Sequence, residues 1–399
     1  MRLCNSLTVG RTAARRTAVG TGLALSALVL TACGGSSKTP AAGSTGGGGA
    51  APVTSTGGSS APIASSAPLH DPAATPRPGA KGKKIVVISS GQASISSSVP
   101  VAGAVEAAKA LGWSTTVYDE QLNPASAPGL VRQAIASGAD GIVLDATDCP
   151  TVKGAMQEAK AKGIKIVGIY SFDCNDPIFG GGGEALFTGQ INYGAGAADI
   201  DKFTQQYGAD QAKAVIAATN GKANVVFLND QEFTVLRYTG KGFLDEMAKC
   251  SGCKVVDKVD FTGAELGPNL QQKVTSALLQ HPEANAIKSP YTAATLLGIG
   301  PAVVSSGRAA KIYSMGGEGF APELDLLRAN QGVSAVEITP SEWTAYAAVD
   351  TLNSLFTGKP AADSGLGWQF VDKNNGLPQS GPYVPKVDFK ADYKKAWGV

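Results

Sequence analysis

Short apolar runs alternate with helix-like segments between residues 83 and 171. The apolar runs are rich in β-branched residues and predict strands over 83–90, 114–119, 140–146 and 165–171. Apolar residues at helical spacing, closed by glycine, predict helices over 101–113, 127–139 and 149–164. This alternation is typical of βαβ units, so we expect a parallel sheet that is covered on both faces.

The same alternation restarts after residue 190. It predicts strands over 223–230, 253–261, 285–290 and 310–317, then an apolar run over 332–339. It predicts helices over 193–207, 234–249, 270–279, 292–305 and 341–358, and residues 368–371 are expected to add a strand. Because the length from Gly82 to Val399 exceeds the usual size of one core, we expect an α/β protein with two doubly wound parallel-sheet lobes.

The N-terminus carries a basic start and an apolar run that stops at a cysteine. Basic residues, and no acidic ones, precede the apolar run 19–30, which is shorter than the roughly 20 residues needed to span a bilayer. This pattern predicts an export signal over residues 1–32. Leu30-Thr31-Ala32-Cys33 is similar to a bacterial lipobox, so Cys33 is the predicted site of lipidation.

Residues 33–81 form the predicted tether. Gly, Ser, Ala, Thr and Pro dominate the segment after Cys33, and aromatic residues are absent from it. Such a composition buries too little apolar surface to offset the chain entropy of folding. We therefore expect the segment to be disordered.

Charge gives no support for a nucleic-acid partner. The formal net charge is +2, and the only basic run is Lys-Gly-Lys-Lys at residues 81–84. Nucleic-acid binding depends on basic patches that release counterions from the phosphate backbone. We expect no nucleic acid among the partners.

Four of the six cysteines remain once Cys4 leaves with the signal and Cys33 takes lipid. They are Cys149, Cys174, Cys250 and Cys253, and they allow three pairings. The Cys250–Cys253 spacing fits a local disulfide, a redox pair or half of a metal site. Since no second such pair and no nearby histidine occurs, we favour a structural disulfide and no metal. That leaves Cys149 with Cys174, and an exported chain permits both bonds.

The sequence shows no constellation typical of catalysis. His281 is the only histidine after the tether, and its position at a helix end favours a structural role. The glycine-rich segment 179–186 lacks the Lys-Ser/Thr that follows a phosphate-binding loop. Paired acids such as Asp145 and Glu318 are the one remaining route to acid and base chemistry. We expect a protein that is not an enzyme and holds no cofactor.

Seven segments, in order and spacing, resemble one family. They are KIVVISS, GAVEAAKALGW, ASGADGIVLDATD, AKAKGIKIVGI, LRYTGKGF, LQHPEANAI and MGGEG. They resemble the type I periplasmic substrate-binding proteins of ABC transporters, in the ribose-binding-protein-like group, over residues 83–360. The resemblance implies two lobes joined by hinge strands that cross near 190–192, near 337–340 and after 358. The N-terminal lobe would comprise 82–190 and 340–360, and the C-terminal lobe 191–339 and 361–399.

The resemblance also implies ligand-binding side chains at the strand ends. The candidates are Ser94, Asp145, Tyr170, Gln190, Arg237, Phe261, Tyr291, Glu318 and Glu337. Arg237 matches the family's ligand-binding arginine, whose fixed fork of donors suits hydroxyls or a carboxylate. Tyr170 stands where pentose binders have aspartate, and Ser96 and Ser97 stand where they place two stacking phenylalanines, so the pentose pattern is missing. Cys149 and Cys174 follow adjacent strand ends, where a bridge would stiffen the cleft rim.

The resemblance implies a function as well. It implies a monomeric, lipid-anchored protein on the outer face of the cytoplasmic membrane that captures a small polar solute, most simply a sugar or sugar-like compound. The two lobes would close on the solute, and an ABC permease would receive it. The alternatives are a sensory protein that signals to a membrane receptor and a binder of a non-sugar solute.

Overall fold

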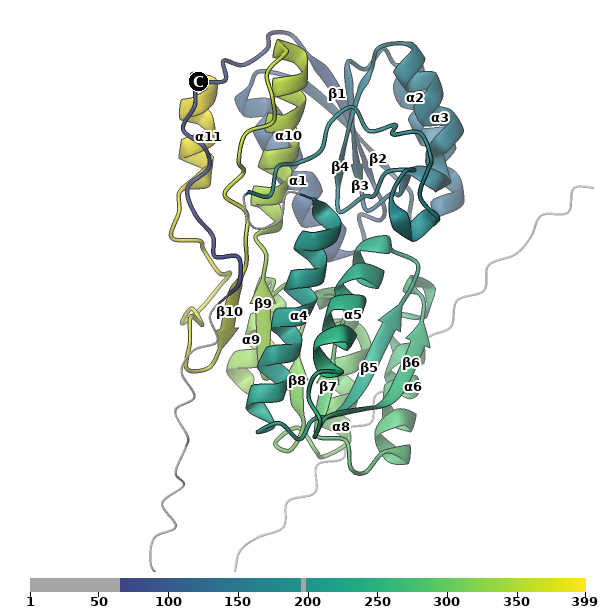
Figure 1. Cartoon of the computed structure of the whole chain (residues 1–399), viewed down its shortest axis with the longest axis vertical. Helices are drawn as coiled ribbons and strands as arrows, with labels where there is room; N and C mark the ends of the chain where they lie inside the picture. The colour runs from purple at the N-terminus through teal and green to yellow at the C-terminus, as the bar shows by residue number, and fades with distance from the viewer. Residues whose placement is uncertain (1–64, 195–198) are drawn as a thin grey trace, which may run out of the picture. The chain divides into compact units, whose positions relative to one another are not determined.

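The computed structural model describes residues 65–194 and 199–399, so the predicted signal peptide, Cys33 and most of the predicted tether lie outside the described residues (Figure 1). The strands are β1 (Lys84–Ser89), β2 (Ser114–Asp119), β3 (Gly141–Asp145), β4 (Lys165–Ile169), β5 (Asn224–Asp230), β6 (Lys254–Phe261), β7 (Ala286–Lys288), β8 (Tyr313–Met315), β9 (Ala335–Ile338) and β10 (Gln369–Asp372). The helices are α1 (Ile95–Ala110), α2 (Ala127–Ala136), α3 (Cys149–Ala161), α4 (Ile200–Ala218), α5 (Thr234–Met247), α6 (Pro268–Gln280), α7 (Thr292–Ala294), α8 (Gly300–Ser305), α9 (Ala321–Ala329), α10 (Ser341–Thr357) and α11 (Phe389–Trp397). Within this described part, no helix combines the length and hydropathy that crossing a membrane requires.

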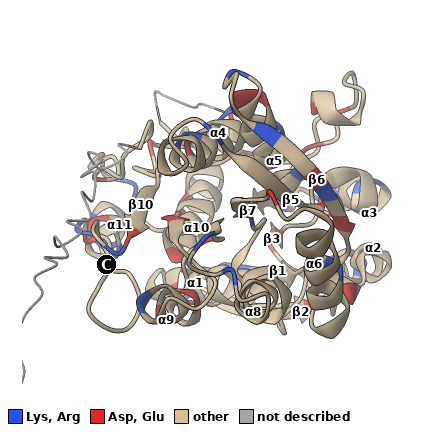
Figure 2. Ribbon diagram, turned by 90° about the horizontal axis from the view of Figure 1, so that it is seen from below, with Lys and Arg blue, Asp and Glu red and all other residues tan. Residues whose placement is uncertain are grey.

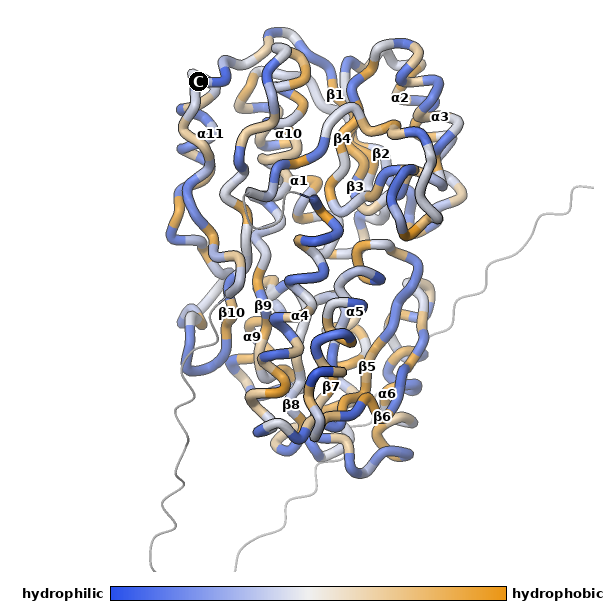
Figure 3. The backbone as a smooth tube through the Cα atoms, in the orientation of Figure 1, coloured by the Kyte–Doolittle hydropathy of each residue, from blue (hydrophilic) through white to orange (hydrophobic). Residues whose placement is uncertain are grey.

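The first sheet is parallel throughout, with the strand order β2-β1-β3-β4. Its central strand β1 is fully buried from Ile85 to Ile88, because helices cover both faces. One core cluster joins the sheet to α1 and α10, and a second joins it to α2 and α3. The strands of the sheet are accordingly hydrophobic, while the outer faces of the helices are hydrophilic (Figure 3).

The second sheet has the order β10-β9-β8-β7-β5-β6. All of its neighbouring strands are parallel except β10, which pairs with β9 in the antiparallel direction. The extra strand predicted over 368–371 is therefore confirmed. Helices α4 and α5 pack on one face, and α6 and α8 pack on the other.

Up to β10, three segments cross between the two lobes, close to the positions that the sequence predicts. The chain crosses from β4 to α4, from β9 to α10, and from α10 to β10. The first and third crossings run side by side, since Asn192 bridges Asp363 and its carbonyl accepts the N–H of Ser364 at 3.0 Å. The predicted fold class, two doubly wound lobes joined by hinge segments, is confirmed.

Two helices begin at positions that the sequence pattern missed. Helix α1 starts at Ile95 rather than 101 and takes Pro100 into its second turn, although serines and a proline are typical of a loop. Helix α4 runs over 200–218 rather than 193–207. Tyr193 instead lies in the crossing segment, where its ring packs 4.4 Å from that of Phe203.

The structure corrects the predicted tether at its C-terminal end. Residues 65–81, which we call the N-terminal strap, lie beside the third crossing and then along α10 and α11, as the purple trace in Figure 1 shows. Backbone hydrogen bonds join the strap to Gly365, Ala396 and Trp397. Arg77 is only 3% exposed, and its Nε lies 3.0 Å from the carboxylate of Asp350. Backbone pairing and one buried ion pair thus order a segment whose apolar content is low.

The structure also corrects the domain boundary predicted at the C-terminus. Residues 361–399 are not all part of the C-terminal lobe, because α11 belongs to the core of the N-terminal lobe. The rings of Trp397 and Tyr346 stack 5.9 Å apart, and those of Phe389 and Trp343 stack 4.8 Å apart. The tail between β10 and α11 therefore crosses the lobes once more.

Candidate functional site

Eight strand ends, four from each sheet, meet at one cavity of about 80 Å³, which we call the main cavity. The N-terminal lobe contributes Ser90, Ser94, Ser96, Ser97, Leu122, Ala146 and Tyr170. The C-terminal lobe contributes Phe233, Val235, Leu236, Gly263, Leu266, Tyr291 and Glu318. Since one water needs about 10–15 Å³, this space suits several waters or one small solute. Carboxyl ends of parallel strands are where open α/β sheets bind ligands.

A second cavity of about 40 Å³, the side cavity, adjoins the main one. The two share Ser90, Leu122, Ala146, Phe233 and Gly263, so together they form one interlobe cleft. The side cavity adds Glu120, Pro124, Thr147, Asp148, Thr151 and Glu232. The cleft therefore combines aromatic and aliphatic walls with hydroxyl and carboxylate groups, as sites for small polar solutes do.

The backbone is strained at three of the strand ends that line the cleft. Leu122, Ala146 and Tyr170 adopt φ angles of 58°, 52° and 53°, which residues other than glycine seldom adopt. They follow β2, β3 and β4 respectively. Strain of this kind costs about 1–3 kcal/mol per residue and clusters at functional sites. The fold holds these residues in place despite that cost.

Direct contacts between the lobes cover the cleft. The Asp148 carboxylate accepts the backbone N–H of Thr234, at the start of α5, at 3.3 Å. The Tyr238 hydroxyl donates to Asp176, and its ring packs 5.0 Å from that of Phe172. Burial raises the pKa of Asp148 to about 6, an effect that hydrogen bonds from Thr234 and Phe172 partly offset. These contacts hold the two lobes together around the cavities.

Four of the predicted ligand-binding residues line the main cavity: Ser94, Tyr170, Tyr291 and Glu318. The Tyr170 hydroxyl exchanges hydrogen bonds with the hydroxyls of Ser341 and Thr344 of α10, and burial raises its pKa to about 12. The Tyr291 hydroxyl donates to Asp230 at 2.9 Å. Burial raises the pKa of Glu318, although the backbone N–H of Thr292 donates to it and offsets part of that effect.

The other five predicted residues lie outside the lining. Asp145, Phe261 and Glu337 are buried behind it, with exposed fractions of 0%, 4% and 1%. Gln190 and Arg237 are exposed, and the guanidinium of Arg237 makes no hydrogen bond or ion pair with the residues that the structure describes. On α5 the neighbouring Val235 and Leu236 face the cavity instead. The exposed positions of Gln190 and Arg237 differ from the ligand-facing positions that the resemblance implies.

Glu120 and Lys288 are two charged residues at or beside strand ends that were not among the predicted ligand-binding residues. Glu120 follows β2, lines the side cavity and accepts a hydrogen bond from Thr147; burial raises its pKa to about 7. Lys288 ends β7 and is 2% exposed; burial lowers its pKa to about 8, against the opposing effects of Glu318 and Glu337. Glu120 directly follows a predicted strand, which was the available signal, whereas a lysine inside an apolar strand gave none.

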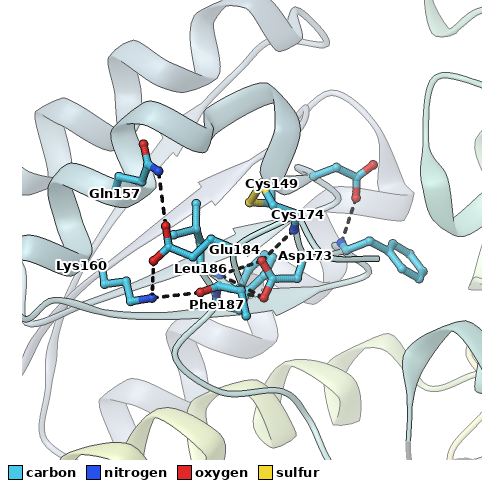
Figure 4. The surroundings of a disulfide bond; sticks show 11 residues. Cys149, Gln157, Lys160, Asp173, Cys174, Glu184, Leu186 and Phe187 are labelled. Carbon is cyan, nitrogen blue, oxygen red and sulfur yellow. Dashed lines mark hydrogen bonds and ion pairs between the residues drawn. A yellow bond between two sulfur atoms is a disulfide. The ribbon is translucent and has the colours of Figure 1, made fainter. Parts of the chain in front are cut away.

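Both predicted disulfides are present, Cys149–Cys174 and Cys250–Cys253. The first joins the start of α3 to the loop after β4 (Figure 4). It lies at the rim of the cleft, because Asp148 and Thr151 beside Cys149 line the side cavity. Beside it the Asp173 carboxylate accepts the backbone N–H groups of Cys174, Leu186 and Phe187. With both sulfurs bonded to each other, these side chains are not arranged as a metal site.

Comparisons with known proteins agree with this geometry. A family model described as periplasmic binding protein domain matches residues 85–360, so the chain belongs to that family.

One similar structure is GanP, a glucose-galactose binding protein from Geobacillus stearothermophilus, with 18% identity and a TM-score of 0.61 over 74% of this chain and 99% of that one. A solute-binding protein from Burkholderia graminis, in complex with D-arabinose, has 20% identity and a TM-score of 0.60 over 75% of this chain and 99% of that one. A 5-methylthioribose transporter solute-binding protein from Thermotoga lettingae has 17% identity and a TM-score of 0.61 over 82% of this chain and 100% of that one. A search of curated protein sequences finds no significant match.

Proposed function

We propose that the protein captures a small polar solute, a sugar or sugar-like compound, in the interlobe cleft and delivers it to an ABC permease. The observation that carries this proposal is the convergence of eight strand ends from two sheets on one cavity between the lobes. A space bounded by two lobes admits a solute when the lobes part and retains it when they close.

The character of the cleft supports a polyhydroxylated solute. Four serines and the carboxylate of Glu318 offer hydrogen-bond donors and acceptors, while Tyr170, Phe233 and Tyr291 offer flat apolar surface. A site of this kind rejects analogues that leave its buried polar groups unpaired. The bound solutes named for similar structures, D-arabinose and 5-methylthioribose, belong to this chemical class.

Calorimetric titration of the purified protein with a panel of monosaccharides, polyols and nucleosides tests the proposal. We expect one compound to bind at a ratio of one per chain and to raise the midpoint of thermal unfolding. A Tyr291→Ala variant should lose that binding, whereas Tyr118→Ala, on β2 away from the cleft, should keep it. Absence of any binder in the panel would remove sugars and sugar-like compounds from the proposal.

Membrane attachment through Cys33 is the second part of the proposal. A Cys33→Ala variant, expressed in a bacterium that processes lipoproteins, should move from the membrane fraction to the soluble exported fraction. The support comes from the sequence Leu30-Thr31-Ala32-Cys33, which follows the predicted export signal. Retention of the variant on the membrane would contradict lipid anchoring and leave the binding function intact.

A further inference from the structure

We propose that the cleft selects a solute that carries a positive charge, of the class of amino sugars and other hydroxylated amines, and excludes acidic solutes. This inference rests on the proposed function and deepens it. It follows from the juxtaposition of lining carboxylates with a buried Asp145, behind the wall of the main cavity, whose carboxylate has no hydrogen bond of good geometry.

The ionisable Asp, Glu, Lys and Arg side chains that line the cleft are all of the acidic kind. Glu120, Asp148, Glu232 and Glu318 line the two cavities, and no Lys or Arg occurs among the described residues that do so. Figure 2 shows acidic positions at the ends of β3 and β5, near the middle of the view. Walls of one sign attract a counterion and repel a solute of the same sign.

Asp145 is the second, independent observation. It ends β3, is 0% exposed, and neither of its carboxylate oxygens has a hydrogen-bond partner of good geometry. It lies on the face of the sheet that α1 covers, close to Ser90, Ser97 and Tyr170, which all line the main cavity. The Ser97 hydroxyl and the backbone N–H of Ser90 offset only part of the cost of burying this carboxylate, so a cation nearby would stabilise its charged form.

The protein's own donors leave these acids without a compensating cation. Asp148 and Glu318 accept backbone N–H groups, and Glu120 accepts a hydroxyl, all of which are neutral. Burial raises the pKa of both Glu120 and Asp145. A neighbouring carboxylate raises each pKa further: Asp119 raises that of Glu120, and Glu120 raises that of Asp145.

The nearest bases do not change this balance. The buried Lys288 faces Glu318 and Glu337 together, so two carboxylates share its single charge. Arg237 is exposed on α5 and does not line either cavity. A protonated amine inside the cleft would therefore be the group that neutralises the lining.

Matched solutes that differ in one group provide the test. Glucose, glucosamine and glucuronate, and the corresponding galactose series, are titrated calorimetrically into the full chain at pH 7. We expect the amine to bind at least tenfold more tightly than the neutral sugar, and the acid not to bind. Equal or tighter binding of the neutral or acidic member would overturn the inference while leaving sugar binding intact.

Proton linkage gives a readout that a general structural role would not produce. A bound cation lowers the pKa of neighbouring carboxyl groups, so glucosamine should release protons on binding and bind more tightly as pH rises from 5 to 7. Glu120→Gln should reduce both the affinity for the amine and the proton release. Glu158→Gln, an exposed carboxylate on α3, should change neither. Proton release that is unchanged in Glu120→Gln would contradict the assignment.

A four-carbon series separates this inference from the sugar assignment. Putrescine, 1,4-butanediol and succinate carry the same three kinds of end group without a sugar ring. Binding of putrescine but of none of the sugars would overturn the sugar class and support the cationic class. Failure of the amines in both series to bind would overturn the inference.

Discussion

Arg77 illustrates how one buried polar side chain orders a segment of low apolar content. Its Nε lies 3.0 Å from both oxygens of Asp350, and its Nη1 donates to the carbonyls of Ala73 and Thr75. The indole of Trp397 donates to the same carboxylate at 2.6 Å. The strap, α10 and α11 thus meet at one charged pair that is almost fully buried.

Arg77→Ala should lower the free energy of unfolding by about 3–5 kcal/mol, because it leaves the buried Asp350 carboxylate without its counter-charge. Urea unfolding followed by circular dichroism measures the change. Arg132→Ala is the matched control, since Arg132 forms an exposed pair with Glu158 and its loss should hardly move the midpoint. Equal effects of the two substitutions would contradict a special role for the strap.

Glu120 gives the ligand-free protein a defined pH dependence. Burial raises its pKa to about 7 from an ordinary value of 4.5, so the folded state favours the protonated carboxyl. The contribution of this group to the free energy of unfolding is fully present below pH 4.5 and is lost as pH rises through 7. At about 1.4 kcal/mol per pKa unit, the loss is about 3 kcal/mol. Glu120→Gln should make the free energy of unfolding less dependent on pH between pH 4.5 and 7. Glu158→Gln should keep the same pH dependence as the parent protein.

At the scale of the elements, periodicity predicted the parallel strands well, because each is a buried apolar run between glycine or polar residues. The pattern missed α9 and α11, which lie beyond the regular alternation, and it missed the strap, whose order depends on partners far along the chain.

Four of nine candidate ligand-binding residues line the cavity, all of them at or near strand ends. Arg237 illustrates why the other five candidates do not line the cavity. Its position on α5 follows from the sequence, but the rotation of that helix, which turns Val235 and Leu236 inward, depends on packing against α4.

The two disulfides should differ in their effect on stability, because they close loops of different length. Cys149 and Cys174 are 25 residues apart, and Cys250 and Cys253 are 3 apart. Loop entropy predicts stabilisation of about 3.5 and about 2 kcal/mol respectively. Thermal unfolding of the double alanine variants measures both. We also expect the Cys149 and Cys174 variant to bind solute more weakly, since its disulfide lies at the cleft rim; normal affinity would contradict that role.

For the whole molecule, the contacts between lobes should decide how often the cleft is closed. Tyr238→Phe removes the hydroxyl that donates to Asp176 across the lobes. A hydrogen bond to a charged group contributes about 1.5–3 kcal/mol, so we expect at least a tenfold loss of solute affinity. Small-angle scattering should show a larger radius of gyration without solute. Tyr118→Phe is the control, because its hydroxyl has no hydrogen bond to the described residues; an equal loss there would argue against closure.

The strap also sets the order in which the chain is able to fold. Its partners are distant in sequence, and Arg77 and Asp350 are 273 residues apart. Contacts of such separation carry a large loop-closure cost and form late. We therefore expect the strap to dock only after α10 and α11 have been synthesised and have packed together. A chain interrupted before residue 397 would lack the last of these partners, so its strap would dock through fewer contacts.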